Sequence, residues 1–344
     1  EIEVIQKELA EKRAAAEELR RLLADEGLRW KLIRDELKDL RKRYSDARRT
    51  EISAPVPVKT YNAEDYIVAE DVFVIVTRDG WVKRQRSYTE VGAIRVREGD
   101  SVGWVLGAST RATVAFFTST GKAYSVRVDA LPSTTGYGDP IQKFFDFADR
   151  ETVVGVVSYD PRVLPASVAD PKVTDANLFG GDGAPASDVI GPFVVAVSRT
   201  GQGVRLPADA FADPSNKNGR TLMRLEKGDA VVMADVAGGA ENVCLASKSG
   251  HVLIFPATEI PVVKGAAKGV IAMRLGAGDA VLGATLATGR RDGLEVETSR
   301  GRREIVRTTK FEVQHRGLRG KPVLQRGGFT RVIAEPVVRG FDEA

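Results

Sequence analysis

The residues best suited to bind an anion are arginines and lysines concentrated between positions 300 and 331. The basic residues of this stretch are Arg300, Arg302, Arg303, Arg307, Lys310, Arg316, Arg319, Lys321, Arg326 and Arg331, and only Glu304 and Glu312 oppose them. Guanidinium groups bind phosphate oxygens in a forked geometry, and clusters of such cations are the usual means of neutralising phosphates. The stretch therefore predicts phosphate binding, with a solvated charged surface as the plainer alternative.

Glycines alternate with these cations. They are Gly317, Gly320, Gly327 and Gly328. Glycine lets the backbone approach a phosphate closely enough for its N–H groups to donate to it. A smaller basic cluster occurs earlier in the chain and consists of Arg78, Lys83, Arg84 and Arg86, opposed by Asp79. This cluster is the second candidate for phosphate binding.

Residue types that carry other chemistry do not converge in the sequence. The single cysteine, Cys244, excludes a disulfide within the chain and lies in an apolar run, where we expect a core residue. The two histidines, His251 and His315, are too few for a histidine-based zinc site, and His251 follows a turn glycine, where a structural role is expected. Asp100, Asp229 and Asp279 recur beside a glycine, which predicts turn chemistry rather than metal binding.

The composition is that of a globular chain with nearly balanced charge. Its 344 residues carry 51 Lys and Arg against 47 Asp and Glu, and 43% of them are hydrophobic. This length allows two domains or one large one. No apolar run approaches the roughly 18 residues that cross a bilayer, and residues 1–3 do not resemble a signal peptide, so we expect a cytoplasmic protein without a membrane partner.

The first 52 residues have a helical pattern. Apolar residues recur at helical spacing in two runs, separated by residues 25–27, where Gly27 is expected to end the first helix. Two interpretations remain open: a helix pair packed on the core of this chain, or half of a coiled-coil arm. Residues 53–71, with Pro55 and Pro57, are expected to form a linker.

Residues 72–344 are dominated by a repeat. A strand, a Thr/Ser-x-x-Gly turn and a second strand occur five times, with turns at residues 77–80, 118–121, 198–201, 247–250 and 298–301. With the strands that follow, each unit supplies about four strands, which predicts a mainly β fold of five blades arranged as a propeller or pinwheel. The proline- and glycine-rich stretch at about 158–191 is an insertion, or alternatively the remnant of a sixth unit.

Two segments resemble a known family. Residues 64–84, EDYIVAEDVFVIVTRDGWVKR, resemble the opening blade of the C-terminal domain in the A subunits of bacterial type IIA topoisomerases, DNA gyrase and topoisomerase IV. Residues 44–52, YSDARRTEI, resemble the end of the coiled-coil arm that precedes that domain. The arm, linker, first blade and repeats follow the order of the family over essentially the whole chain.

The resemblance implies a β-pinwheel whose basic rim binds and bends duplex DNA. The partners it implies are double-stranded DNA, the ATPase B subunit of an A2B2 enzyme and the remainder of the A subunit. ATP and magnesium would act on other domains, so no cofactor is expected here, and no catalytic residue is assigned: Tyr88 imitates the context of the family's nucleophilic tyrosine only superficially. The residues expected to contact DNA are Lys83, Arg84, Arg86, Arg302, Arg303, Arg307, Gln314, Arg316, Gly317, Arg319, Gly320, Lys321 and Arg326.

The sequence differs from the gyrase pattern in two features. The gyrase box resembles Gln-Arg-Arg-Gly-Gly-Lys/Arg-Gly and lies in the first blade, whereas the matching loop here, residues 87–93, is too short to hold one. The nearest match, QHRGLRGK at residues 314–321, lies in the last unit, and five units are more similar to topoisomerase IV. The alternative function is a propeller that binds an acidic protein partner through its arginines; a propeller enzyme is disfavoured.

Overall fold

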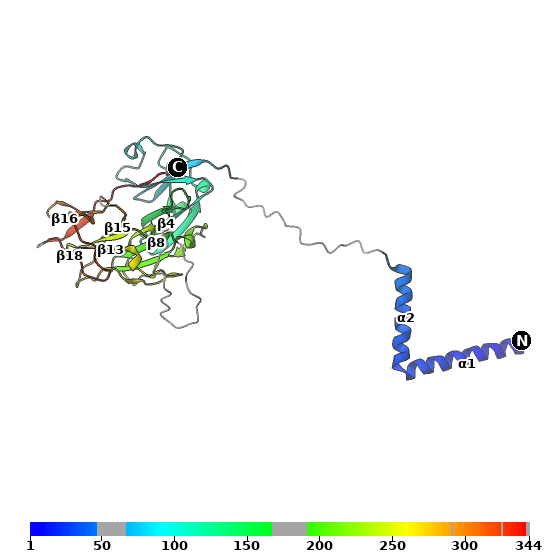
Figure 1. The fold of residues 1–344 in the computed structure, drawn as a ribbon. Helices are drawn as coiled ribbons and strands as arrows, with labels where there is room; N and C mark the ends of the chain where they lie inside the picture. The colour runs from blue at the N-terminus through cyan, green and yellow to red at the C-terminus, as the bar shows by residue number, and fades with distance from the viewer. Residues whose placement is uncertain (47–66, 167–190, 290–291, 325, 342–344) are drawn as a thin grey trace. The chain divides into compact units, whose positions relative to one another are not determined.

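The computed structural model describes residues 1–46, 67–166, 191–289, 292–324 and 326–341, which fall into a helical unit and a β unit (Figure 1). The units divide between Tyr61 and Asn62. The predicted linker up to residue 66, and most of the predicted insertion, lie outside the described residues. No helix in the described part of the chain is long and apolar enough to span a bilayer.

The helical unit consists of α1 (Ile2–Ala24) and α2 (Glu26–Tyr44). Asp25 separates them, and its carboxylate accepts hydrogen bonds from the backbone N–H groups of Gly27 and Leu28 at 2.7 and 3.3 Å. The expectation that Gly27 ends the first helix is therefore wrong. The glycine lies in the first turn of α2, because the aspartate side chain caps that helix.

The β unit consists of five small sheets, here called blades one to five. Blade one contains β1 (Asp71–Thr77), β2 (Trp81–Gln85), β3 (Val102–Ser109), β6 (Asp139–Pro140) and β20 (Val337–Arg339). Blade two contains β4 (Thr113–Thr118), β5 (Lys122–Arg127), β7 (Val153–Ser158) and β10 (Arg220–Thr221). Blade three contains β8 (Phe193–Ser198), β9 (Gln202–Pro207), β11 (Val231–Ala237) and β14 (Val270–Ile271).

Blade four contains β12 (Asn242–Ser247), β13 (His251–Pro256), β15 (Val281–Ala287) and β18 (Lys321–Pro322). Blade five contains β16 (Leu294–Thr298), β17 (Arg303–Val306) and β19 (Phe329–Val332). Short 3-10 helices lie between strands: η2 (Val91–Ala93), η3 (Val128–Ala130), η4 (Ile141–Lys143), η5 (Ala208–Phe211) and η6 (Ala257–Glu259). The predicted mainly β fold with five blades is confirmed for the described residues.

In every blade the predicted turn joins two consecutive, paired strands: β1 and β2, β4 and β5, β8 and β9, β12 and β13, or β16 and β17. The glycine that ends each turn has a positive φ, between 74° and 85°, and its N–H donates to the threonine or serine three residues earlier. The repeated aspartates hold these turns, as predicted: Asp229 accepts from the N–H of Thr200 at 3.1 Å and from its hydroxyl at 2.7 Å. Asp279 accepts from Ser249 in the same way.

Neighbouring blades exchange strands, a feature that the repeat did not predict. The outermost strand of blades one to four is a two-residue strand that comes from the chain segment of the next blade. Thus β6 pairs with β2, β10 with β5, β14 with β9 and β18 with β13. The count of about four strands per unit holds, but the fourth belongs to the sheet of its neighbour.

The central strands of blades one to four, β1, β4, β8 and β12, each contribute to two hydrophobic cores, one on either side of the blade. In β12, for example, Val243 and Leu245 pack with blade three, while Cys244 and Ala246 pack with blade five. Side chains alternate between the faces of a strand, so a blade that is covered on both faces reads as a continuous apolar run. This explains why most blades show such runs in the sequence.

Cys244 provides a test of this packing. The residue is fully buried, and this burial, together with the charge of Asp292, raises the pKa of its thiol to about 12. The thiol therefore stays protonated at pH 8 in the folded chain, and its alkylation should be slow. We expect iodoacetamide to label less than roughly a hundredth as fast in buffer as in 6 M urea, measured by mass spectrometry; equal rates would contradict the buried position.

Candidate nucleic-acid interface

Four chain segments carry the exchanged strands to the outer edges of the blades. These exchange segments are residues 131–143, 212–224, 261–274 and 313–326. Each contains a glycine with positive φ just before its strand, at Gly138, Gly219, Gly269 and Gly320. A Cβ atom at any of the four would lie closer than 3.0 Å to a backbone carbonyl oxygen in the strand with which the exchanged strand pairs, β2, β5, β9 or β13. Glycine is therefore required there for close packing between segments.

The last three exchange segments also contact one another. Arg224 donates its backbone N–H to the carbonyl of Ala267, and Arg274 donates to the carbonyl of Leu318, both at 2.9 Å. Gly317 in turn donates to the carbonyl of Ala272 at 2.7 Å. The segments 212–224, 261–274 and 313–326 therefore form one continuous band along the outer edges of blades two to four, which we call the rim.

Arginines recur on the rim at equivalent positions. Arg224 and Arg274 each follow a buried methionine, and both are exposed. Lys143 occupies the same position in the first exchange segment and pairs with Asp139 at 2.7 Å. The side chains of Arg224 and Arg274 have no ion pair with any residue that the structure describes, so they are available to an external anion. Neither was predicted as a site residue, although the repeated Met-Arg-Leu at 223–225 and 273–275 was visible in the sequence.

The match to the gyrase box, residues 314–321, lies within the rim. Arg319 is exposed, and its guanidinium lies next to Gly276, which follows Arg274 by two residues in the sequence. Arg316 is instead held by the protein: its backbone N–H donates to a carboxylate oxygen of Glu259 at 2.8 Å, and its Nε donates to the Glu259 carbonyl at 2.7 Å. His315 is 2.8 Å from the same carboxylate. Glu259 therefore fixes the shape of this loop, while Arg319 remains free to bind.

The glycines and Gln314 of this match have structural roles. Gln314 donates its backbone N–H to Ile254 at 2.7 Å, and Gly320 seats the segment against Val252. Lys321 is exposed and pairs with Glu312 at 2.8 Å. These contacts show how the last exchange segment is anchored on blade four. Lys321 therefore lies on the rim, where its ammonium already forms an ion pair with Glu312.

Two cations of the earlier cluster, Lys83 and Arg84, bind backbone carbonyls of the protein itself. Lys83 is only 1% exposed, and its ammonium donates to the carbonyls of Arg95 and Gly136 at 2.8 and 2.6 Å. Burial and the nearby Arg95 lower the pKa of this ammonium. Arg84 is half-buried and donates its Nε to the carbonyl of Leu131 at 2.9 Å. Lys83 is therefore unavailable to DNA, and Arg84 is partly occupied by backbone carbonyls of its own blade and the adjoining segment.

The remaining predicted cations lie outside the three rim segments or at their end. Arg86 is exposed and pairs with Glu70 at 2.8 Å. Arg303 pairs with Glu295 at 3.5 Å, and Arg307 is half-buried in blade five. Arg302 and Arg326 are exposed, and neither has an ion pair with the described residues. The structure thus brings Arg316, Arg319, Lys321 and Arg326 together in one segment and separates Lys83, Arg84 and Arg86 from it.

Other site chemistry is not assembled in the described part of the chain. No group of three or more His, Cys, Asp or Glu side chains there could hold a metal ion. Tyr88 packs its ring edge-on against Phe73, with the ring centroids 4.9 Å apart. His251 lies 2.9 Å from the hydroxyl of Ser249, inside the turn that the repeat predicted. The exposed arginines of the rim are therefore the most distinctive chemical feature of the β unit.

A ring of strand-exchanged blades with cations on its exchange segments defines a β-pinwheel. Residues 112–159, 192–237 and 241–288 match the family described as "DNA gyrase C-terminal domain, beta-propeller". These three stretches contain the main strands of blades two to four and are similar to that family. The resemblance predicted from residues 44–84 is confirmed.

Sequence relatives and solved structures agree with this family. The chain is 26% identical over 335 residues to the DNA gyrase A protein of Pseudomonas aeruginosa, covering 89% of this chain and 36% of the relative. It is 27% identical over 359 residues to the DNA gyrase A protein of Kosmotoga olearia, covering 100% and 41%. The chain thus spans well under half the length of these curated relatives.

Two solved structures share the fold. The C-terminal domain of DNA topoisomerase IV superposes with a TM-score of 0.62 at 22% identity, covering 77% of either chain. The E. coli ParC C-terminal domain superposes with a TM-score of 0.56 at 18% identity, covering 76% of this chain and 98% of that one. These likenesses confirm the β-pinwheel arrangement of the blades.

Proposed function

We propose that this chain binds duplex DNA along the rim and bends it, as the C-terminal part of a type IIA topoisomerase A subunit. The observation that carries the proposal is the repetition of exposed arginines on adjoining exchange segments, Arg224, Arg274 and Arg319, none of which forms an ion pair with the described residues. Phosphates recur at regular intervals along a duplex, so one cation per blade matches a backbone that follows the outer edge of the ring. Arg326 extends the same series, and Lys321 adds a cation that pairs with Glu312.

The contacts would read the backbone rather than the bases. In the described part of the rim, the exchange segments carry cations and backbone N–H groups but only two-residue strands and no α-helix that could enter a groove, so specificity would depend on DNA shape and deformability. Bending a stretch of 20–30 base pairs by 40–90° costs on the order of 1–6 kcal/mol, which several charge-assisted contacts can offset. The bent duplex would be presented to the breakage region of the parent enzyme as the segment to be transported.

The partners and location follow from the proposal. The remainder of the A subunit would supply DNA breakage, the B subunit would supply ATP hydrolysis with magnesium, and the complex would work in the cytoplasm on the nucleoid. This chain would need no cofactor of its own for DNA binding. Its contribution would be electrostatic and geometric.

A salt titration tests the proposal. We expect the full chain to bind a 40-base-pair duplex, and the logarithm of the association constant to fall linearly with the logarithm of salt concentration. About six phosphate contacts give a slope near −5. Fluorescence anisotropy between 50 and 300 mM NaCl measures it, with a fluorescent polyglutamate peptide as the control ligand. A slope near zero, or tighter binding of the acidic peptide than of DNA, would favour a protein-interaction propeller instead.

A further inference from the structure

The junction between blade five and blade one, here called the seam, differs from the other junctions of the ring. Four hydrophobic clusters are each shared by two successive blades, from one and two to four and five. The fifth cluster, built on Ile75, Ile94, Val102 and Val105, belongs to blade one alone. Among the described residues, no hydrophobic cluster joins blade five to blade one.

The face of blade five that is turned away from blade four is charged. In β16, Leu294 and Val296 pack into the cluster shared with blade four, while Glu295 and Glu297 lie on the opposite face. These glutamates pair with Arg303 and Arg331. A face covered with ion pairs cannot supply the apolar packing that joins the other blades.

The seam also lacks the strand exchange of the other junctions. Within the described residues, β17 has no outer partner strand, whereas β2, β5, β9 and β13 each have one. The part of blade one that corresponds to an exchange segment folds back on its own blade, where Tyr88 packs on Phe73 and Ile94 joins the cluster of blade one. Blade one therefore covers its own free face.

The C-terminal segment crosses from blade five to blade one. Its strand β20 pairs in parallel with β3, with Val337 opposite Trp104 and Arg339 opposite Leu106. The guanidinium of Arg78, which lies 4.5 Å above the Trp104 ring, donates to the carbonyl of Glu335 at 3.0 Å.

Phe341 ends this segment in a defined seat on blade one. Its ring lies against Gly107, where an added Cβ would come within 3.2 Å of it, and its centroid is 5.7 Å from that of Phe73. The guanidinium of Arg162 covers the ring at 4.4 Å. Aromatic and cationic contacts of this geometry stabilise a docked side chain.

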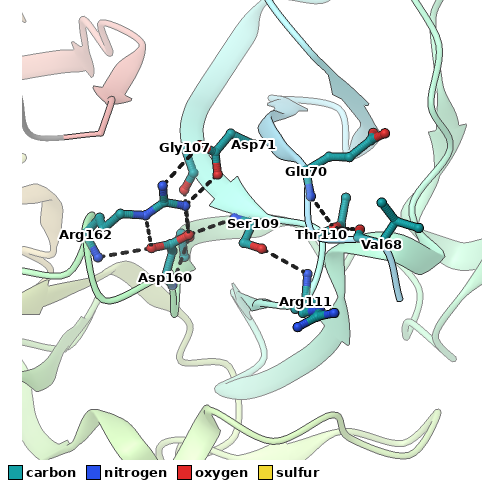
Figure 2. Close-up of polar contacts among 10 residues, drawn as sticks. Val68, Glu70, Asp71, Gly107, Ser109, Thr110, Arg111, Asp160 and Arg162 are labelled. Atoms are coloured by element: carbon teal, nitrogen blue, oxygen red, sulfur yellow. Dashed lines mark hydrogen bonds and ion pairs between the residues drawn. The ribbon is translucent and has the colours of Figure 1, made fainter. Parts of the chain in front are cut away.

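Arg162 is itself held in place by two carboxylates, as Figure 2 shows. It donates to Asp160 at 2.9 and 3.0 Å and to Asp71 at 2.7 and 3.1 Å. Asp160 is nearly fully buried and also accepts from the N–H of Ser109 at 2.7 Å. Residues of the first two blades therefore fix the position of the Arg162 guanidinium against which Phe341 packs.

One more contact reaches across the ring. Arg339 of β20 donates to the carboxylate of Asp235 in β11 at 2.7 Å, and both side chains are largely buried, at 28% and 21% exposed. Residues 335–341 thus contact blades one, two and three within seven positions. Among the described residues that follow β19, these seven make the contacts with blades one to three given above.

We propose that residues 335–341 are a latch that closes the ring at the seam and sets the curvature of the rim. Docked, the latch holds blade five beside blade one; released, it leaves a junction with neither a shared core nor an exchanged strand, and the seam opens. The consequence for DNA rests on the proposed function: an open seam lets the outer edge straighten, so a bound duplex bends less.

Spin-label distances across the seam test the latch without DNA. The full chain carrying Asp79→Cys and Arg300→Cys has labels at equivalent turn positions in blades one and five, and buried Cys244 stays unlabelled. We expect a single narrow distance distribution by pulsed electron resonance. The double variant Arg339→Gln, Phe341→Ala should lengthen and broaden it. Val338→Ala is the matched control, because this β20 side chain is exposed and outside the latch contacts.

A second variant separates latch release from misfolding. Gly107→Val fills the seat of Phe341 from the side of blade one and leaves every latch residue intact, so it should open the seam to a similar extent. Far-ultraviolet circular dichroism identifies any variant that has lost its sheets. Distributions that match the unsubstituted chain in both variants, or one that is already broad before substitution, would overturn the proposal.

The bend of bound DNA is measured in a separate experiment from the distance across the seam. Energy transfer between dyes at the ends of a bound duplex should decrease when the latch is released, while the salt slope stays unchanged, because the rim cations are not altered. If the chain binds no DNA, the proposed function fails, yet the seam distances still decide the latch. If DNA binds and the bend is unchanged although the seam opens, the latch does not set the curvature.

Discussion

Replacing Gly155 by alanine is expected to lower the free energy of unfolding by about 3 kcal/mol or more, the largest effect of any single methyl addition in the β unit. Gly155 lies in β7. A Cβ atom there would lie much closer than 3.0 Å to the backbone carbonyl oxygen of Ala234 in β11, and real Cβ atoms essentially never come so close to another heavy atom. Backbone cannot rotate away as a side chain can, so blades two and three would have to separate.

Thermal and urea unfolding of the full chain, followed by circular dichroism, measure this effect. Gly92→Ala is the matched control, since nothing lies within 4 Å of a Cβ at Gly92 and its φ is not positive. We expect the control to stay within about 0.5 kcal/mol of the unsubstituted chain. Equal stability of the two variants would mean that β7 and β11 do not pack backbone to backbone.

This glycine illustrates how much of the fold the sequence contains. Its place in the apolar run Val153-Val154-Gly155-Val156-Val157 signals a close backbone approach within a strand. The sequence does not say what approaches, because the neighbouring strand β11 lies beyond the insertion. The turn glycines were predictable for the opposite reason: their positive φ is a local requirement, repeated in every blade.

The strand exchange could not be predicted from periodicity. The exchanged strands β6, β10, β14 and β18 are two residues long, too short to show an alternating pattern. The seam, by contrast, was visible in the sequence. Residues 294–298, Leu-Glu-Val-Glu-Thr, alternate between apolar and polar, whereas β1, β4, β8 and β12 are apolar on both faces. That contrast marks blade five as the end of the series.

The candidate site was predictable as a region and less so by residue. Charge density identified the segment with Arg316, Arg319 and Lys321, and the structure places it on the rim. Charge alone could not distinguish Lys83 from these, because the carbonyls that bury its ammonium, at Arg95 and Gly136, are distant in sequence. Arg224 and Arg274 were missed because neither lies in a stretch as densely basic as residues 300–331. Their signal is repetition, and it becomes meaningful only once adjoining blades are known to align.

Replacing Arg224, Arg274 and Arg319 together by glutamine is expected to weaken duplex binding by roughly a hundredfold or more at 100 mM salt. Each arginine is proposed to neutralise one phosphate, so the log–log salt slope should become shallower by about 2.7, or 0.9 for each contact. The fold should persist, because these side chains form no ion pairs with described residues. Circular dichroism checks the fold, and anisotropy titrations between 50 and 300 mM NaCl measure affinity and slope.

The control keeps the change in net charge and moves it to the helical unit. Arg13, Arg20 and Arg34 are exposed on α1 and α2, and their replacement by glutamine removes the same three charges. If binding depended only on overall charge, the two triple variants would lose the same affinity. If the rim is the interface, only the rim variant changes the slope, because the slope counts the phosphates that are contacted, whereas a charge that contacts no phosphate acts only through a field that salt screens within about 10 Å.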